Sequence, residues 1–166
     1  MDQNLQGRPV SCSAVHEQLA VVFPDDLNTN GTLFGGRVLE MADRLCAIVA
    51  KRHTGRACVT LGIDSVRFLA PAHHGDILIF QASINRVWRS SMEVGIRVTA
   101  ENYVDRKAIR IFSAYFTFVA VDEFLKPVSI APAIPETEEE KRRYIQAEER
   151  RRHRMSMGQK SKGTTD

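Results

Sequence analysis

The chain has 166 residues and a formal net charge of +3 at pH 7, a length that suits one domain with its own core and a tail. Hydrophobic residues make up 43% and charged residues 26%, which excludes wholesale disorder and is typical of a soluble globular protein. The three cysteines, Cys12, Cys46 and Cys58, have no CxxC spacing, so neither a disulfide framework nor a zinc site is predicted.

The sequence shows no signal for membrane insertion or export. No run approaches the roughly 18 apolar residues of a membrane span, and the first residues, MDQNLQGRPV, lack the charged-then-apolar layout of a signal peptide. We therefore expect a cytoplasmic protein without a membrane partner. Charge is uneven along the chain: residues 141–162 hold nine Lys or Arg against two Glu, so this segment carries +7 and the rest carries −4.

The first half of the chain predicts a strand, a loop and a long helix. Residues 12–23, CSAVHEQLAVVF, have the apolar and β-branched character of a strand, and the following PDDLNTNG is dense in turn formers. From Gly36 the pattern VLEMADRLCAIVAKRH places apolar residues around most of a helical circumference. We expect a buried helix that ends near His53, where a basic last turn and then Gly55 suit a helix C-terminus.

The second half predicts an antiparallel sheet. Its segments are rich in β-branched or aromatic residues, and PAHHG, RS and YVD between them are short enough for hairpins. The predicted strands are 57–69, 76–88, 91–102 and 107–121. Because neither the helix nor the sheet can hide its apolar face alone, we expect an α+β fold in which a hairpin-linked sheet wraps one central helix.

A change of composition after Pro127 predicts a separate C-terminal segment. The stretch from Pro135 to Arg154 has acids in its first turn and arginines near its end, which fits a polar helix, and residues past Met155 should be frayed. The predicted organisation is a flexible N-terminus (1–11), one domain (12–126), and a linker, basic helix and tail (127–166).

Asp43 stands inside the apolar pattern of the central helix. It lies either on a narrow solvent-exposed strip of the helix with Glu40, Arg44 and Lys51, or in a position from which water is excluded. In the second case burial would raise the pKa of the carboxylate and suit it to work as a general base or nucleophile.

Two features of the preceding loop are also candidates. Gly35 and Gly36 let backbone approach a ligand, and the unpaired N–H groups of a helix N-terminus favour an oxyanion or phosphate; the alternative is a plain tight turn. Asn28 and Asn30 lie in a turn-rich segment, where asparagine more often organises an Asx turn or caps a helix than serves catalysis. The loop alone does not distinguish the two asparagines.

Four ordered blocks carry a resemblance to a known family. They are PDDLNTNGTLFGG, the helix with MAD, CVTLGIDSVRFLAPAHHGD and WRSSMEVGIRVTAEN. With them the chain resembles, from about Leu19 to Val121, the hotdog-fold acyl-coenzyme A thioesterases, in the group of YciA-type enzymes and brain acyl-CoA hydrolases. The resemblance implies a single hotdog domain that hydrolyses acyl-CoA thioesters to free fatty acid and coenzyme A.

The resemblance also implies a catalytic set. In that family a loop Asn and a helix Asp fifteen positions later form the catalytic pair, which falls on Asn28 and Asp43 here. The family's active sites lie at a dimer interface, so Asn28 of one subunit is expected to meet Asp43 of its partner. An N–H of Gly35 or Gly36 would stabilise the oxyanion. Phe34 stands where family members commonly have His, which removes a polar contact.

Coenzyme A contacts are implied in the same way. The segment Arg89, Ser90, Ser91, Met92 resembles the nucleotide-side contact, Arg67 and the tail arginines are further candidates, and Thr60 is expected near the thioester. No metal and no cofactor beyond the coenzyme A of the substrate are expected. Self-association into dimers, and into a hexamer built as a trimer of dimers, is expected.

Three other functions are weighed against this one. A non-catalytic acyl-CoA sensor of the same fold would carry a helix-turn-helix, and a dehydratase would carry a GHFPxxPxxPG-like segment; neither is found. Nucleic-acid binding by the basic tail is not expected, because the strands show no aromatic stacking motif and a solvated charged helix is the commoner arrangement.

Overall fold

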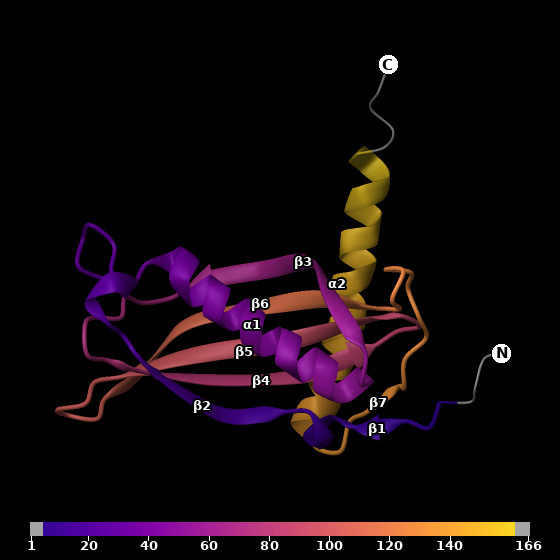
Figure 1. Ribbon diagram of the computed structural model, residues 1–166, viewed down its shortest axis with the longest axis horizontal. Coiled ribbons are helices and arrows are strands. Elements are labelled where there is room, and N and C mark those ends of the chain that lie inside the picture. Colours follow the sequence, from indigo (N-terminus) through magenta and orange to yellow (C-terminus); the bar gives the residue numbers. More distant parts are fainter. Residues whose placement is uncertain (1–4, 162–166) are drawn as a thin grey trace.

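The computed structural model describes residues 5–161, and the side chains of residues 5–156. Within these residues one five-stranded sheet carries a long helix, α1, across one face, and a second helix, α2, passes behind the sheet on the opposite face (Figure 1). The elements in chain order are β1 (Arg8–Pro9), η1 (Val10–Cys12), β2 (Val15–Val21), η2 (Pro24–Asp26), α1 (Gly35–Thr54), β3 (Ala57–Phe68), β4 (Ile77–Val87), β5 (Ser91–Glu101), β6 (Ala108–Val121), β7 (Ala133–Ile134) and α2 (Glu138–Ser161).

Helix α1 forms the core with one face of the sheet. Its buried residues recur at helical spacing and pack against the inward side chains of the strands, among them Phe112, Phe116 and Phe118 of β6, each at most 1% exposed. The helix ends at Gly55, whose φ of 65° is the left-handed conformation that glycine adopts without strain. The predicted helix, the five strands of the sheet and the α+β class are confirmed, with boundaries shifted by at most three residues.

The order of strands differs from a simple series of hairpins. The sheet runs β2-β4-β5-β6-β3 with antiparallel neighbours, so β3 pairs with β6 and lies at an edge, three strands away from β4. The segment between β3 and β4 crosses the end of the sheet instead of turning back. Ala72 O accepts a hydrogen bond from Leu33 N at 2.8 Å, and Gly75 N donates to Val22 O at 3.0 Å. The prediction of a β3–β4 hairpin was therefore wrong.

The segment expected as a flexible N-terminus is tied to the domain over its described part. Strand β1 pairs in parallel with β7, which lies in the predicted linker, and Val10 is only 1% exposed. Arg8 N donates to Pro132 O at 2.8 Å. Residues 1–4 and 162–166, which belong to the predicted flexible ends, lie outside the described residues, and α2 continues to Ser161.

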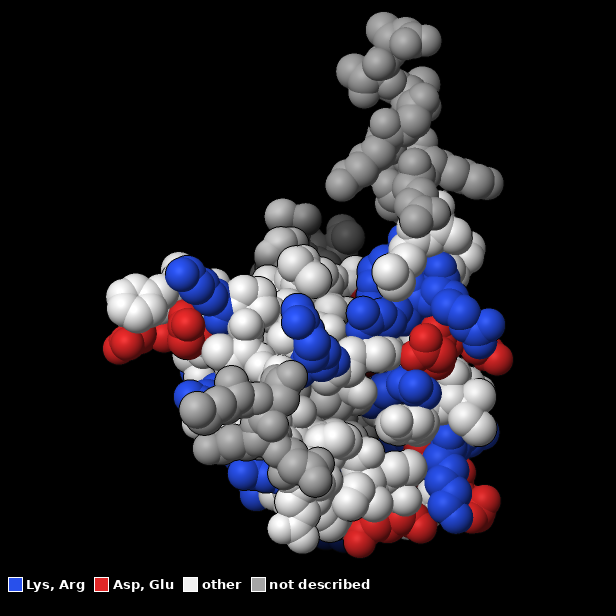
Figure 2. Space-filling model, turned by 90° about the vertical axis from the view of Figure 1, so that its right-hand side faces the viewer, with Lys and Arg blue, Asp and Glu red and all other residues white. Residues whose placement is uncertain are grey.

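Helix α2 is attached to the outer face of the sheet by polar contacts. Glu93 of β5 is 0% exposed, and Arg150 of α2 donates to both of its carboxylate oxygens, at 2.7 and 3.1 Å. Asn85 Nδ2 donates to Glu93 as well, at 2.9 Å, and the Arg150 guanidinium lies 3.7 Å above the Tyr115 ring centroid. Lys and Arg gather on this side of the molecule, with Asp and Glu among them (Figure 2).

The same helix also holds the turn between β4 and β5. Trp88 Nε1 donates to Glu148 Oε2 at 2.9 Å, and the Arg151 guanidinium lies 4.4 Å above the Trp88 ring centroid. Arg151 also donates to Ser91 Oγ at 3.4 Å.

Neither helix in the described part of the chain is long and apolar enough to span a membrane.

His53 makes stability depend on pH. Burial lowers the pKa of this histidine, whose Nε2 donates to Ala131 O at 3.1 Å while Nδ1 is buried without a partner in the described structure. Because the folded pKa lies below the unfolded value of 6.5, the stabilising contribution is complete above pH 6.5 and is lost as the pH falls through the folded pKa.

The free energy of unfolding in urea should therefore decrease between pH 7.5 and pH 5. The variant His53→Gln keeps a hydrogen-bond donor but does not titrate, so its free energy of unfolding should change less with pH. An unchanged slope in His53→Gln would contradict this assignment.

Candidate active site

A buried aspartate shapes the loop that leads into α1. Asp26 is 5% exposed, and its backbone oxygen accepts from Phe34 N at 2.8 Å, directly before the first helical residue. Its carboxylate accepts from Phe23 N at 2.9 Å and from Arg37 Nε at 2.7 Å. This network fixes where the helix begins. The role of Asp26 was not predicted from the sequence, although an acidic residue three positions after Phe23 in a Pro-containing turn is a typical signal of such an arrangement.

Asn28, not Asn30, organises this loop. Its Oδ1 accepts from Asn30 N at 2.9 Å and from Thr32 N at 3.2 Å, and its Nδ2 donates to Thr32 Oγ1 at 3.0 Å. These bonds hold the Asn28 amide, which is half-buried, in one orientation. No hydrogen bond joins Asn28 to Asp43 within the described chain.

Gly35 and Gly36 open α1 with unpaired donors. Neither N–H has a hydrogen-bond acceptor among residues 5–156, as expected for the first turn of a helix. Aromatic rings lie where side chains would project: a Cβ at Gly35 would come within 3.0 Å of Phe68, and a Cβ at Gly36 within 2.6 Å of Phe34. The helix start is therefore a set of backbone donors beneath two half-exposed aromatic rings.

Asp43 faces β3 and is not part of the charged strip on α1. Glu40 pairs with Arg37 at 2.8 Å and with Arg44 at 2.6 Å, whereas the Asp43 carboxylate accepts a hydrogen bond from Thr60 Oγ1 at 2.8 Å. The side chain is half-buried in a single chain, so the fully desolvated carboxylate considered from the sequence is not observed here. Thr60 and Asp43, both predicted site residues, are thus brought together.

The length of the helix separates Asp43 from the glycine donors. At 1.5 Å per residue, the seven residues from Gly36 to Asp43 place them about 10 Å apart along the axis. A reacting carbonyl must lie roughly 3 Å from both its oxyanion donors and its base or nucleophile. The two groups of one chain therefore cannot act on the same carbonyl.

The segment Arg89–Met92 lies at the end of the sheet where Thr60 meets Asp43. The register places Met92 beside Phe118, and Phe118 beside Thr60, on the neighbouring strands β5, β6 and β3. Arg89 and Ser90 form the turn, and Ser91 opens β5. Met92 is 0% exposed in the core, so a side-chain contact from Met92 to a nucleotide is not compatible with the structure.

Arg67 lies on the other face of the sheet. It pairs in register with Ser113, whereas its neighbour Phe68 pairs with the core residue Phe112. Two irregularities in β3, between Thr60 and Gly62 and between Asp64 and Arg67, change the alternation that the sequence predicts. The structure does not bring Arg67 together with Asp43 and Thr60.

The described residues contain no group of three or more His, Cys, Asp or Glu arranged to hold a metal ion. The site thus consists of an oriented amide, a pair of backbone donors and a carboxylate hydrogen-bonded to a hydroxyl. Such groups suit a reaction in which a nucleophile attacks a carbonyl carbon and the carbonyl oxygen becomes an anion.

Comparison with known proteins identifies the family. The model of the thioesterase superfamily matches residues 30–105. The acyl-CoA thioester hydrolase YkhA of Bacillus subtilis, itself uncharacterised, is 40% identical over 119 residues, which cover 72% of this chain and 69% of the relative. This chain belongs to the thioesterase superfamily. The resemblance to hotdog acyl-CoA thioesterases noted from the motifs is confirmed.

Solved structures of thioesterases have the same fold. An apo hexameric acyl-CoA thioesterase has a TM-score of 0.89 at 38% identity, covering 93% of this chain and 98% of that one. The acyl-CoA hydrolase of Staphylococcus aureus, in complex with butyryl coenzyme A, coenzyme A and coenzyme A disulfide, has a TM-score of 0.86 at 35% identity and covers 95% of each chain. Variants of that enzyme with an aspartate, an asparagine or a threonine replaced by alanine have also been solved.

Cys46, one turn from Asp43 in this thioesterase, is structural. Burial raises the pKa of its thiol well above the ordinary value, and the nearby charge of Asp43 adds to the effect. In the double variant Cys12→Ser/Cys58→Ser, Cys46 should react with an aromatic disulfide reagent at least about 100-fold more slowly in the folded protein than in denaturant, because reaction requires opening of the core. Rapid labelling of the folded double variant would contradict the packing described.

Proposed function

We propose that this protein hydrolyses acyl-CoA thioesters to a fatty acid and coenzyme A, at a site completed by two copies of the chain. The observation that carries the proposal is the 2.8 Å hydrogen bond from Thr60 of β3 to Asp43 of α1, the helix that opens with two unpaired N–H groups. Membership of the thioesterase superfamily, and relatives named acyl-CoA thioester hydrolases, support it.

The reaction follows from the chemistry of these groups. Asp43 takes a proton from water as the water oxygen attacks the thioester carbonyl, or the carboxylate itself attacks and forms an anhydride that water then opens. Thr60 holds the carboxylate in place by its hydrogen bond. The carbonyl oxygen becomes an oxyanion and accepts from the N–H of Gly35 or Gly36. Collapse breaks the carbon–sulfur bond, and the coenzyme A thiolate takes the proton that the attacking water gives up.

The 10 Å between the glycine donors and Asp43 of one chain supports a shared site. We assign Asn28, Gly35 and Gly36 to one subunit, and Asp43 with Thr60 to the other. Asn28 then orients water or the thioester across the interface. The loop bonds of Asn28 support this role, because they fix its amide in advance of binding.

Strand β3 is the surface proposed for pairing with the second copy. It is an edge strand of the sheet, twelve residues long, and it exposes Val59 (43%), Leu61 (70%) and Phe68 (58%). A long apolar edge offers unpaired backbone groups to another strand. Some of the similar solved structures are hexamers. We propose that three dimers of this chain associate in the same way into a trimer of dimers.

The turn at Arg89–Ser91 is proposed to contact the phosphates of coenzyme A. Arg89 is exposed there, and arginine binds phosphate in a bidentate manner. The contacts from Glu148 and Arg151 to this turn support an ordered position for it. A cytoplasmic location, a role in fatty acid metabolism, the absence of a cofactor and the absence of nucleic-acid binding remain predictions.

Replacing either member of the proposed pair should lower turnover strongly. Asp43→Asn removes the base or nucleophile and should lower kcat/KM by about 10²–10⁴-fold; Asn28→Ala should lower it by about 10²-fold. The measurement is release of free thiol from a panel of acyl-CoAs of different chain length.

The matched control is Glu40→Gln, which removes a carboxylate on the exposed strip of the same helix. Its turnover should stay close to that of the unchanged protein. If all three variants retain turnover, the catalytic assignment is wrong. If the unchanged protein binds acyl-CoA without releasing thiol, the non-catalytic acyl-CoA sensor is favoured instead.

A charge on the β3 edge should separate the subunits. Leu61→Lys buries an ammonium in the proposed interface and should weaken self-association at least about tenfold, with a parallel loss of thiol release. Sedimentation velocity over a concentration series measures the first effect. Phe124→Lys, at an equally exposed position (72%) in the turn after β6, should leave assembly unchanged. Wild-type assembly and activity in Leu61→Lys would rule out β3 as the interface.

A further inference from the structure

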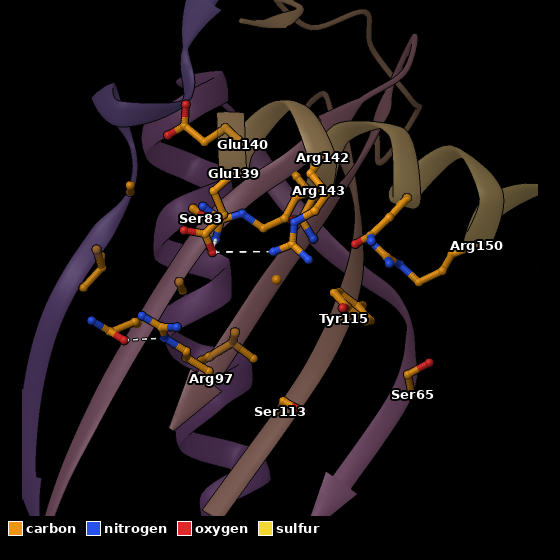
Figure 3. A pocket seen from close by; sticks show the side chains of 18 of the residues that line it. Ser65, Ser83, Arg97, Ser113, Tyr115, Glu139, Glu140, Arg142, Arg143 and Arg150 are labelled. Atoms are coloured by element: carbon orange, nitrogen blue, oxygen red, sulfur yellow. Dashed lines mark hydrogen bonds and ion pairs between the residues drawn. The ribbon is translucent and has the colours of Figure 1, made fainter. Parts of the chain in front are cut away.

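A polar groove lies on the outer face of the sheet, opposite to the α1 side that carries Asp43. Its volume is about 820 Å³, its floor is formed by the strands, and α2 forms one wall. Figure 3 shows Arg97, Ser113 and Tyr115 on the floor, with Arg142 and Arg143 reaching in from α2. The proposed catalytic reaction uses none of these residues.

The floor contains a row of side chains across four adjacent strands. The register aligns Gln81 of β4 with Arg97 of β5, Arg97 with Ser113 of β6, and Ser113 with Arg67 of β3. Neighbouring strands lie about 4.8 Å apart, so the backbones of Arg67 and Arg97 are about 10 Å apart with a hydroxyl between them. Arg110 lines the groove close by. The row therefore presents guanidinium, hydroxyl and guanidinium in sequence.

These exposed arginines have no direct carboxylate partner in the described part of the chain, although Glu139, Glu140 and Glu149 also line the groove. No ion pair joins Arg67, Arg97 or Arg110 to a carboxylate among residues 5–156. Arg97 is held instead by the neutral Gln81, whose Oε1 accepts from its Nε. Like charges facing one groove repel, and an anion between them removes the repulsion.

Some arginines elsewhere in the described structure have carboxylate partners, whereas others, such as Arg52 and Arg89, have none. Arg37, Arg44, Arg150 and Arg154 all have carboxylate partners. In the groove wall, Arg142 and Arg143 lie 3.9 Å from the single carboxylate of Glu139. A solvated surface accounts for single unpaired arginines such as Arg52, whereas the register of the sheet aligns two of them on either side of Ser113.

We propose that the Arg67–Ser113–Arg97 row is a second ligand site, which binds the phosphoryl group of a small molecule. Guanidinium groups bind phosphate oxygens in pairs, and the serine hydroxyl adds a donor between them. The groove is larger than an inorganic ion requires and falls in the size range of small-molecule sites. The ligand is a free phosphate compound or the diphosphate of a nucleotide. The proposal does not depend on thioester hydrolysis.

The experiment is calorimetric titration of the full chain with inorganic pyrophosphate and, separately, with ADP, in the absence of acyl-CoA. Arg67→Gln/Arg97→Gln should weaken binding at least about tenfold, since it removes two charge-assisted contacts. Arg52→Gln, the same change at an exposed position on α1, should leave binding unchanged. Tighter binding of ADP than of pyrophosphate identifies a nucleotide; equal binding identifies the phosphoryl group alone.

Ser113→Asp is a second, independent variant. A carboxylate between the two arginines supplies the missing anion within the chain, so this variant should melt at a higher temperature and bind neither probe. The proposal is overturned if the unchanged protein binds neither probe at millimolar concentration, or if the arginine double variant binds as tightly as the unchanged protein. It is also overturned if the groove variants dissociate the assembly in sedimentation, which would make this face a contact between copies.

Discussion

The fixed rise of an α-helix is the constraint on which the proposed function depends. Helix α1 is 20 residues long, begins with the two backbone donors and carries Asp43 two turns further on. Because a helix cannot shorten, the glycine donors and the backbone of Asp43 in one chain stay about 10 Å apart along the axis. Two helices that face each other in opposite directions remove this separation. Strand β3 pairs with β6 on one side only, and its free, apolar edge is the surface that we propose joins the two copies.

Much of the fold could be predicted from local patterns. Apolar residues around most of a circumference predicted α1, and alternation along residues 91–102 predicted β5 almost to its ends. The partner of β3 could not be predicted in this way, because strand pairing is set by contacts between segments far apart in sequence. The short PAHHG link suits a hairpin, yet its backbone bonds to Leu33 and Val22 carry the chain across the end of the sheet.

The candidate site was predictable only in part. The family spacing selected Asn28 over Asn30, and the structure gives a physical counterpart, because of these two asparagines only Asn28 has side-chain hydrogen bonds within the described loop. Asp43 was noticeable as a carboxylate in an apolar pattern. The position of Arg67 was not predictable, since irregularities in β3 move residues between the faces of the sheet. The Arg67–Ser113–Arg97 row on the outer face depends on the register of neighbouring strands. The sequence of any one strand does not reveal that register.

The buried Glu93–Arg150 pair has a consequence for how this protein changes over evolutionary time. The two residues are separated by 57 positions in the chain, yet each is the main charge partner of the other. Loss of one alone leaves a buried charge uncompensated, at a cost of about 3–5 kcal/mol, whereas joint replacement by apolar residues of similar volume is tolerated. Substitutions at these two sites should therefore be inherited in pairs, and a lineage that discards α2 must also give up the glutamate on β5.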